Sequence, residues 1–331
     1  MEVPGRARDS GAPASRGARM TPPIVYHPDY MAQLRPGHRF PMSKYGYLRE
    51  ALAARGLLPA GGFLAPAPAP VALVAAVHRF DYVERVATQR LTPAEERRIG
   101  LPGTPAVARR AFLSAAGTLL AARLALEHGL ALNMAGGSHH AGPEGGAGFC
   151  VFNDVAVAAQ ALLHEGRVAR VLVVDCDVHQ GDGTAEIFAG RDEVMTLSLH
   201  AEKNYPARKA VSSLDFPLPD GLADRPYLEV LDHALGLTES FRPGIVFYNA
   251  GVDPHRDDRL GRLGLTSDGL RARDARVIGW ARARGLPLAC VLGGGYDTDP
   301  GRLAARHAIL FEEAARAAGG DGGRIAHPTA R

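Results

Sequence analysis

Short apolar runs that alternate with longer helical stretches are the feature that most constrains the fold of this 331-residue chain. The runs are bounded by Gly, Pro or Asp and are typical of buried strands. Strands that alternate with helices predict a three-layer αβα fold with a mainly parallel central sheet. Ligands of such sheets bind outside the carboxyl ends of the strands. The predicted strands are 71–74, 130–134, 171–174, 194–199, 245–248 and 288–292, and the predicted helices are 104–128, 154–165, 227–241, 267–284 and 301–318.

The composition supports one large folded unit between two tails. Hydrophobic residues make up 46% of the chain, enough to bury a sizeable core. Residues 1–20 are rich in Gly, Pro, Ser and Arg and poor in large apolar side chains, which predicts a disordered N-terminal tail. We expect a single domain over 21–318 and a loose C-terminal tail over 319–331. Because the fold pattern begins at Ile24, Met20 is an alternative start to Met1.

Charge and cysteine content narrow the partners and the compartment. The formal net charge is only +3 and the arginines are spread along the chain, so no nucleic acid is expected as an obligatory partner. Cys150, Cys176 and Cys290 lie in apolar surroundings without Cys-x-x-Cys spacing, which predicts reduced thiols in a cytoplasmic protein. We expect neither a membrane span nor an export signal, because the chain shows no apolar run of roughly 18 to 20 residues.

A cluster of metal-ligand residue types follows the predicted strand at 171–174. The run continues as Asp175-Cys-Asp177-Val-His179-Gln-Gly-Asp182-Gly. Side chains alternate along a strand, so residues 175, 177 and 179 can point to the same side. Asp and His are ligands that Zn²⁺ accepts, and the run therefore indicates a metal site. A buried strand that ends in a polar turn is the plainer alternative.

Three further clusters also follow predicted strands. Two adjacent imidazoles, His139 and His140, follow a glycine pair and could serve as an acid/base group beside an electrostatic partner, or could be a surface pair. Asp253 follows the strand at 245–248, where a lone Asp is commonly a helix cap or a turn residue. Tyr296 follows three glycines and could reach the same site, or could be a core aromatic with a satisfied hydroxyl.

Together these motifs resemble those of the histone deacetylase family, which has the arginase/deacetylase fold. The resemblance spans roughly residues 24–318 and keeps the family order: Gly-Gly-Ser-His-His-Ala, Gly148-Phe-Cys-Val-Phe-Asn-Asp154, Asp-Cys-Asp-Val-His-Gln-Gly-Asp-Gly, Gly-Val-Asp and Gly-Gly-Gly-Tyr. Arg39-Phe-Pro-Met-Ser-Lys-Tyr45 and Gln180 are similar to the class IV branch and its bacterial relatives. The resemblance implies a zinc-dependent amidohydrolase that removes acetyl or longer acyl groups from lysine side chains of proteins or peptides.

The resemblance also implies ligands for two metal ions. Asp177, His179 and Asp253 would hold a catalytic Zn²⁺, with Fe²⁺ as the alternative ion, and would leave positions open for water and substrate. A structural K⁺ would be held by Asp175 and Ser198 together with carbonyls of Asp177, His179 and Leu199.

The remaining roles follow from the same resemblance. His140 would be the general base and later the acid, and His139 its electrostatic neighbour. Asp182 and Asp175 would orient these two rings through hydrogen bonds. Tyr296 would donate to the substrate carbonyl. Gly148 and Phe149 would line a narrow acyl-lysine tunnel.

Rival functions and open points remain. Binuclear manganese ureohydrolases share the fold but need extra carboxylate ligands, where this chain has Gly181 and His255. A non-catalytic acyl-lysine binding module and a deacetylase of small acylated amines such as acetylpolyamines are further alternatives. Asp257 stands where relatives of this family commonly carry a Gly. We expect 90–106 and 202–208 to be loops at the mouth, and a monomer by default.

Overall fold

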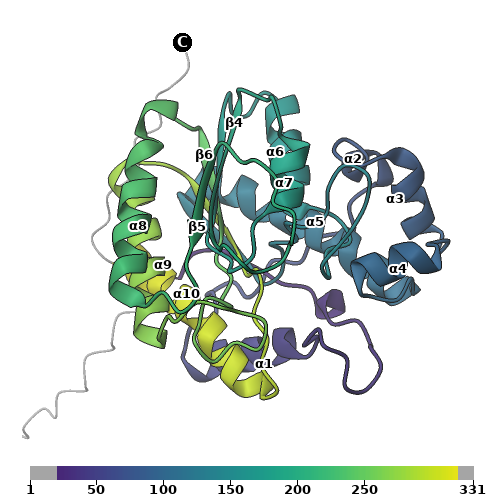
Figure 1. The fold of residues 1–331 in the computed structure, drawn as a ribbon, viewed down its shortest axis with the longest axis horizontal. Helices are drawn as coiled ribbons and strands as arrows, with labels where there is room; N and C mark the ends of the chain where they lie inside the picture. Colours follow the sequence, from purple (N-terminus) through teal and green to yellow (C-terminus); the bar gives the residue numbers. More distant parts are fainter. Residues whose placement is uncertain (1–20, 320–331) are drawn as a thin grey trace, which may run out of the picture.

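A computed structural model describes residues 21–319 and contains one seven-stranded sheet in the order β1-β2-β7-β6-β3-β4-β5 (Figure 1). Every strand pair is parallel, which confirms the predicted α/β fold. The strands are β1 Ile24–Val25, β2 Leu130–Asn133, β3 Val171–Asp175, β4 Val194–Ala201, β5 Leu214–Leu218, β6 Ile245–Asn249 and β7 Leu288–Val291. The helices are η1 Pro28–Tyr30, α1 Lys44–Ala54, α2 Val71–Val74, α3 Phe80–Ala87, α4 Pro93–Ile99, α5 Pro105–His128, α6 Asp154–His164, α7 Asp182–Ile187, α8 Asp224–Leu237, η2 Glu239–Phe241, α9 Ser267–Ala283 and α10 Pro300–Gly319.

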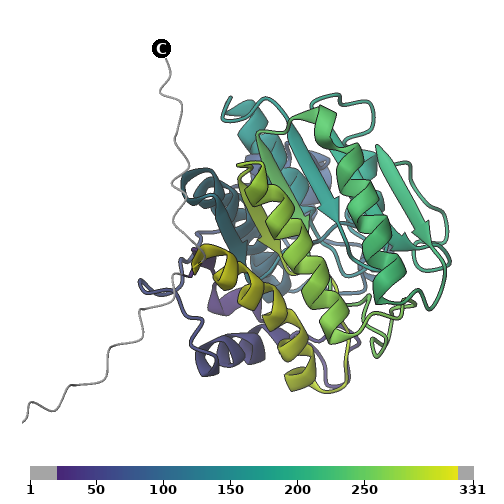
Figure 2. The same cartoon turned by 90° about the vertical axis from the view of Figure 1, so that its left-hand side faces the viewer.

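Helices cover both faces of the sheet. In Figure 1 the sheet is seen nearly edge-on, with α8 and α9 on one side and α5 and α6 on the other. Figure 2 looks onto the first of these faces, where α8, α9 and α10 lie side by side. The helices α2, α3 and α4 form a lobe beside α5 (Figure 1). The predicted tails lie outside the described residues, except for Gly319 at the end of α10.

Strand β3 shows why the core has two halves. Its side chains alternate between the faces: Leu172 and Val174 belong to the larger apolar cluster with α8 and α9, whereas Val171 and Val173 belong to the smaller one with α5 and α6. All five residues of β3 are buried. A strand covered on both faces is continuously apolar, which is the pattern visible in the sequence.

The strand predicted at 71–74 is wrong, because these residues form helix α2. A run of four apolar residues does not distinguish a strand from one helical turn. Pro70 precedes the helix at a position where its fixed φ suits a helix start. Only Val74 is fully buried, as expected for a helix that packs on one side, here against α3 and α6.

The segment 90–106, predicted as a loop, contains helix α4. Thr92 Oγ1 accepts a hydrogen bond from the Glu95 amide, and the Glu95 carboxylate accepts one from the Thr92 amide. This capping box stabilises the helix start, and its Thr-x-x-Glu spacing is readable in the sequence. The second predicted mouth loop, 202–208, has no regular structure.

Two strands escaped the sequence prediction because they are short or irregular. Strand β1 has only two residues, and β5 contains Pro217. Proline cannot donate to a strand ladder and is tolerated at an edge, which is where β5 lies. Within residues 21–319, no helix combines the length and apolar character that a membrane crossing requires. All three cysteines are buried and unpaired, as predicted.

The topology brings four sequence clusters to one edge of the sheet. The strands β2, β7, β6 and β3 are consecutive neighbours, and their carboxyl ends precede His139, Tyr296, Asp253 and Asp177 respectively. Because parallel strands end at the same edge, segments more than 150 positions apart in the chain meet there.

Candidate metal centre and acyl pocket

Asp177, His179 and Asp253 form a buried cluster at the carboxyl ends of β3 and β6. One potential ligand atom from each lies within 4.8 Å of those of the other two. His179 Nδ1 lies 3.0 Å from Asp177 Oδ1 and 3.3 Å from Asp253 Oδ2. Two carboxylates and one imidazole that converge in this way match the donor set of a catalytic zinc site.

Backbone amides hold the two carboxylates in place. The Gly294 amide donates to Asp177 Oδ2 at 2.6 Å, and the Val178 amide donates to Asp253 Oδ1 at 2.9 Å. The other Asp253 oxygen, Oδ2, is buried and accepts no hydrogen bond within the described part of the chain. A buried carboxylate oxygen without a donor is costly unless a cation neutralises it. The residues therefore fit a divalent metal ion.

Arg273 of α9 fixes the loops that carry these ligands. It is fully buried, and its Nη1 donates to the carbonyls of Cys176, at 3.2 Å, and Gly251, at 2.5 Å. Its charge is balanced by Asp274, 2.9 Å away. The guanidinium thus ties the end of β3 to the end of β6, and the separation of Asp177 from Asp253 depends on it.

The two histidines lie beside the cluster, and each ring is paired with a carboxylate. His139 Nδ1 lies 2.6 Å from Asp175 Oδ2, and His140 Nδ1 lies 2.6 Å from Asp182 Oδ1. The ring centroids of the two histidines are 4.1 Å apart. Because each Nδ1 faces a carboxylate, it carries the proton, and Nε2 of each ring is directed elsewhere. The sequence prediction placed both carboxylates next to these rings.

The surroundings separate the pKa values of the two imidazoles. Burial, followed by the positive charge of His139, lowers the pKa of His140 to about 4. Burial opposes the charged form of His139 as well, but the carboxylates of Asp175 and Asp177 raise its pKa to about 9. One ring is therefore neutral and able to accept a proton, while the other is cationic. A bound dication would lower both pKa values, because its positive charge opposes protonation of either ring.

The turn that presents the histidines requires glycine. Gly136 and Gly137 have φ values of +86° and +79°, in the left-handed region. A Cβ on Gly137 would lie 2.4 Å from Asn249 Oδ1 and 2.6 Å from the Gly293 backbone. Asp154 accepts hydrogen bonds from the amides of Gly137 and Ser138, which fixes the turn that His139 follows.

Tyr296 and two other aromatic side chains surround the approach to the cluster. Phe149 and Tyr205 lie on the pocket that leads to His140, His179 and Tyr296. The Tyr205 ring packs edge-on against His140 at 4.8 Å, and the Phe149 ring lies 6.0 Å from that of Tyr296. Phe149 has φ +66°, so it holds a left-handed conformation directly after Gly148. Burial and the nearby carboxylates raise the pKa of Tyr296 well above that of an ordinary phenol, which keeps it a donor.

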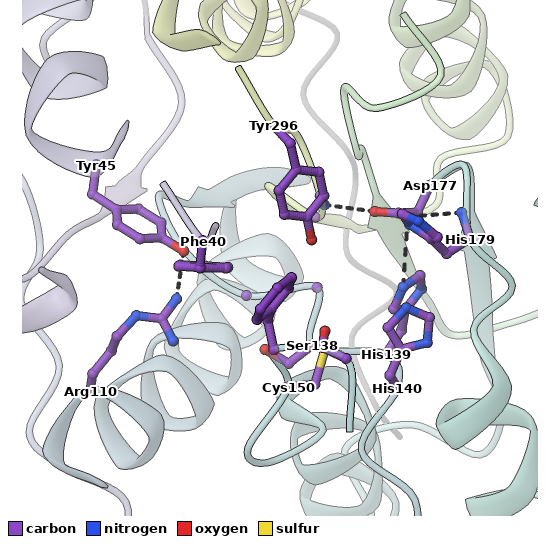
Figure 3. Close-up of a pocket in the computed structure, with 16 residues that line it drawn as sticks. Phe40, Tyr45, Arg110, Ser138, His139, His140, Cys150, Asp177, His179 and Tyr296 are labelled. Carbon is purple, nitrogen blue, oxygen red and sulfur yellow. Dashed lines mark hydrogen bonds and ion pairs between the residues drawn. The ribbon is translucent and has the colours of Figure 1, made fainter. Parts of the chain in front are cut away.

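The pocket continues inward to a buried arginine. Figure 3 shows Tyr296 between the Asp177 and histidine side of the pocket and the side formed by Tyr45 and Arg110. Arg110 donates to the Tyr45 hydroxyl at 2.5 Å and to the Tyr30 carbonyl at 3.0 Å. Arg110 lines the pocket, and no carboxylate within residues 21–319 forms an ion pair with it.

The side chains expected to hold K⁺ lie where β3 pairs with β4, close to the Asp177–His179–Asp253 cluster. Asp175 and Ser198 are neighbours across the β3–β4 pair. Ser198 and Leu199 are buried, and Ser198 Oγ lies 3.0 Å from His200 Nδ1. No hydrogen bond of the described residues reaches the carbonyls of Asp177 or His179. These oxygens are therefore available to a cation.

Sequence reasoning missed several residues of the site, and some had a signal. Arg110 lies with Val107, Ala111 and Ser114 on the buried face of α5, so a charged residue in an apolar helical stripe was visible. Tyr205 is in the predicted mouth loop, but nothing in the sequence distinguishes it there. Lys44 is buried and donates to the Gly293 carbonyl at 3.1 Å, a contact across 249 positions that no local pattern predicts.

Comparison with known proteins identifies the family. A model described as the histone deacetylase domain matches residues 38–310, most of the chain. The chain belongs to the histone deacetylase family. It is 31% identical over 281 residues to histone deacetylase 2 of Arabidopsis thaliana, covering 81% of this chain and 72% of that protein. It is 46% identical over 293 residues to an uncharacterized protein of a Picosynechococcus species, covering 88% and 98%. A solved acetylpolyamine aminohydrolase from Burkholderia pseudomallei superposes with a TM-score of 0.71 and 25% identity, covering 88% and 98%.

The residues around the metal cluster differ from those that a binuclear manganese site of the ureohydrolase type would need. Among the described residues, Asp177, His179 and Asp253 are the one group of three or more His, Cys, Asp or Glu that could hold a metal ion. A Cβ at Gly181 would lie 2.6 Å from Asp175 Oδ2, so a side chain at this position would require the Asp175 carboxylate to shift. The His255 ring is engaged instead by the Asp257 amide at 3.1 Å and Ser267. Asp257 has no left-handed φ, so a glycine is not required at that position.

Proposed function

We propose that the protein is a zinc-dependent amidohydrolase that removes acetyl or longer acyl groups from the lysine side-chain amine of proteins or peptides. The observation that carries this proposal is that a three-residue cluster able to hold a metal ion, the His140 imidazole and the buried Tyr296 phenol meet beside one pocket. Family membership supports amide hydrolysis. Phe149 and Tyr205 place two aromatic rings along the approach, which suits an aliphatic chain.

Asp177, His179 and Asp253 would hold Zn²⁺, with Fe²⁺ as the alternative ion. When bound, the ion supplies Lewis acidity, which makes a water molecule a better nucleophile and a carbonyl a better electrophile. The orphaned Asp253 Oδ2 and the amide-anchored Asp177 support this assignment. The buried Asp175–Ser198 region and the free carbonyls of Asp177 and His179 support a structural K⁺.

The two histidines would have different roles in the reaction. His140, neutral and oriented by Asp182, would accept a proton from water at Nε2 and return it to the departing amine. His139, held by Asp175, would be the electrostatic neighbour of His140 beside the reacting carbonyl. General acid–base catalysis of this kind typically contributes about 10²- to 10⁴-fold.

Tyr296 would stabilise the negative charge that develops on the carbonyl oxygen. Its raised pKa keeps the hydroxyl protonated and ready to donate. Amide hydrolysis also produces a carboxylate, and the unpaired guanidinium of Arg110 at the inner end of the pocket would attract it. Three buried, unpaired cysteines support a reducing, cytoplasmic location.

A small acylated amine is the second candidate substrate. The observation that favours it is the structural similarity to a protein described as an acetylpolyamine aminohydrolase. The acyl-lysine peptide and the small acylated amine would undergo the same reaction. They differ in the part of the substrate that remains outside the tunnel.

Mass spectrometry of reaction products tests the proposal. Zinc-loaded full-length protein is incubated with lysine peptides carrying acetyl to myristoyl chains and with acetylpolyamines, and free amine and released acid are measured. We expect turnover that disappears in Asp177→Ala and persists in Asp192→Ala, a matched change at an exposed carboxylate. Tight binding without product from any substrate would instead favour the non-catalytic binding module.

A further inference from the structure

Four arginines surround the outer pocket that leads to the metal cluster. His140, His179 and Tyr296 lie at its inner end. Its rim includes the loop before α1 and the end of α4, and these contribute Arg35 and Arg39, and Arg97 and Arg98, respectively. No Asp or Glu is among the described residues that line it. We call these four residues the mouth arginines.

Acidic side chains of the protein do not neutralise the mouth arginines. All four are exposed, and none forms an ion pair within residues 21–319, although other exposed arginines such as Arg79 do. Two acidic residues near the mouth arginines, Glu95 in α4 and Asp297, which lines a neighbouring pocket with Arg35 and Arg39, are already paired with other arginines. Glu95 pairs with Arg85 at 2.7 Å, and Asp297 pairs with Arg302 at 2.9 Å and Arg306 at 3.1 Å.

Arg98 and His38 show how the arginines relate to the pocket that they line. Arg98 Nε donates to the Gly146 carbonyl at 2.9 Å, which holds its side chain close to the segment that carries Phe149. Burial and the charge of Arg35 together lower the pKa of His38, another lining residue. A concave surface with charge of one sign concentrates ligands of the opposite sign.

We propose that the mouth arginines bind carboxylates next to the acylated lysine, so that the substrate is an acidic peptide segment with Asp or Glu flanking the acyl-lysine. This inference rests on the proposed function. With the acyl chain in the tunnel, the flanking residues of a peptide lie at the rim, where guanidinium groups can grip carboxylates in a bidentate manner. An acetylpolyamine would instead bring ammonium groups to the same rim, and like charges repel.

Three matched peptides test the inference with zinc-loaded full-length protein. They share one acetyl-lysine and carry Asp, Asn or Lys on both sides of it. At low salt we expect kcat/KM to be highest for the Asp peptide, lower for the Asn peptide and about tenfold lower for the Lys peptide than for the Asp peptide. The difference should lie mainly in KM, because the rim does not touch the reacting amide. The difference in kcat/KM between the peptides should decrease as the salt concentration is raised, since screening weakens contacts between exposed charges.

Charge variants assign the effect to the rim. In the double variant Arg35→Gln/Arg97→Gln we expect kcat/KM for the Asp peptide to approach that for the Asn peptide. Arg167→Gln is the matched control: Arg167 is exposed and precedes β3, at the opposite edge of the sheet, so the preference should be unchanged. Equal rates on the three peptides, or a preference that survives the double variant, would overturn the inference.

Separate outcomes distinguish failure of the inference from failure of the proposed function. Turnover of all peptides without charge preference rejects only the acidic-substrate inference, as does faster turnover of an acetylpolyamine than of every peptide. Absence of turnover on every substrate rejects the proposed function. In that case, fluorescence anisotropy with labelled Asp and Asn peptides still tests the rim, and equal affinity for both would overturn the inference.

Discussion

The Asp258 carboxylate accepts a hydrogen bond from the backbone amide of Tyr296 at 2.6 Å. Its other oxygen accepts from the amides of Leu260, at 2.9 Å, and Gly261, at 3.0 Å. One side chain therefore joins the loop after β6 to the loop after β7. Asp258 does not reach the reacting groups itself, so we expect it to act by positioning the Tyr296 phenol.

Replacing Asp258 should impair turnover more than metal binding. In Asp258→Ala the Tyr296 amide loses its acceptor. We expect kcat to fall about 10- to 100-fold, the range typical when a residue that orients a functional side chain is removed. Asp258→Asn keeps one acceptor oxygen and should lie between Ala and the wild type. Steady-state kinetics together with zinc content measured by atomic absorption checks this. Loss of zinc in step with activity would indicate a role in the metal site instead.

Tyr296→Phe isolates the phenol hydroxyl. The ring remains to fill the pocket, while the donor to the developing oxyanion is lost, so we expect kcat to fall by about 10²- to 10³-fold. Zinc content and the far-UV circular dichroism spectrum should be unchanged. Tyr47→Phe is the control, because Tyr47 is 45% exposed on α1 and does not line the pocket. Full activity in Tyr296→Phe would refute the function assigned to this hydroxyl.

Metal removal should lower thermal stability as well as activity. Burial and the neighbouring charge of Asp177 raise the pKa of Asp253 to about 6, which shows that two carboxylates share this space unfavourably. Zn²⁺ at about 100 times its Kd should add about 2.7 kcal/mol to the free energy of unfolding, a rise of roughly 5 °C in Tm. Calorimetry of the chelated protein with and without added Zn²⁺ measures the shift. We expect none in Asp177→Ala, and little with Mg²⁺, which prefers six oxygen ligands.

Gly137 and Gly166 form a pair that separates backbone strain from steric overlap. Both have left-handed φ values, +79° and +64°, but a Cβ would clash only at Gly137. We expect Gly166→Ala to reduce the free energy of unfolding by about 1 kcal/mol and Gly137→Ala by about 3 kcal/mol or more. Gly137→Ala should also lose activity, because the turn presents His139 and His140. Equal stability losses in chemical denaturation would contradict the packing seen around Gly137.

The sequence was sufficient to predict the central strands and the meeting of Asp177, His179 and Asp253 at their carboxyl ends. Strands β3 and β6 are buried on both faces, so they appear as unbroken apolar runs, and the polar residues after them stand out. The parallel topology then requires their carboxyl ends to meet, which brings Asp177 and Asp253 together. The predicted pairs of His139 with Asp175 and His140 with Asp182 follow from the family resemblance, and the structure contains both contacts.

Other features depend on contacts that no local pattern encodes. The run at 71–74 is as apolar as a strand, but it forms a helical turn because tertiary packing buries only Val74. Arg110, Lys44 and Tyr205 gain their positions from the packing of α5, α1 and the 202–208 loop around the pocket. The arginine-rich rim likewise combines two segments that are about 60 positions apart and show no shared motif.

The surroundings of His78, which is not one of the metal-binding residues, predict that the stability of the protein depends on pH. Its Nδ1 lies 2.8 Å from the Gly142 carbonyl, and its Nε2 accepts a hydrogen bond from the Asn153 amide at 2.9 Å. A neutral ring satisfies both contacts, whereas a cation cannot accept from Asn153. Burial lowers the pKa of His78 to about 4, against about 6.5 for an unfolded chain.

The sign of the effect follows from proton binding. Between about pH 6.5 and 4 the unfolded chain binds a proton at His78 that the folded protein does not, so the free energy of unfolding falls as pH decreases through this window. The pKa difference corresponds to about 3 kcal/mol, fully present above pH 6.5. Urea denaturation at pH 7.5 and 5 should show a smaller difference in His78→Gln, whose amide oxygen can still accept from Asn153. The same substitution at the exposed His164 is the control, and an unchanged pH dependence in His78→Gln would contradict a buried neutral imidazole.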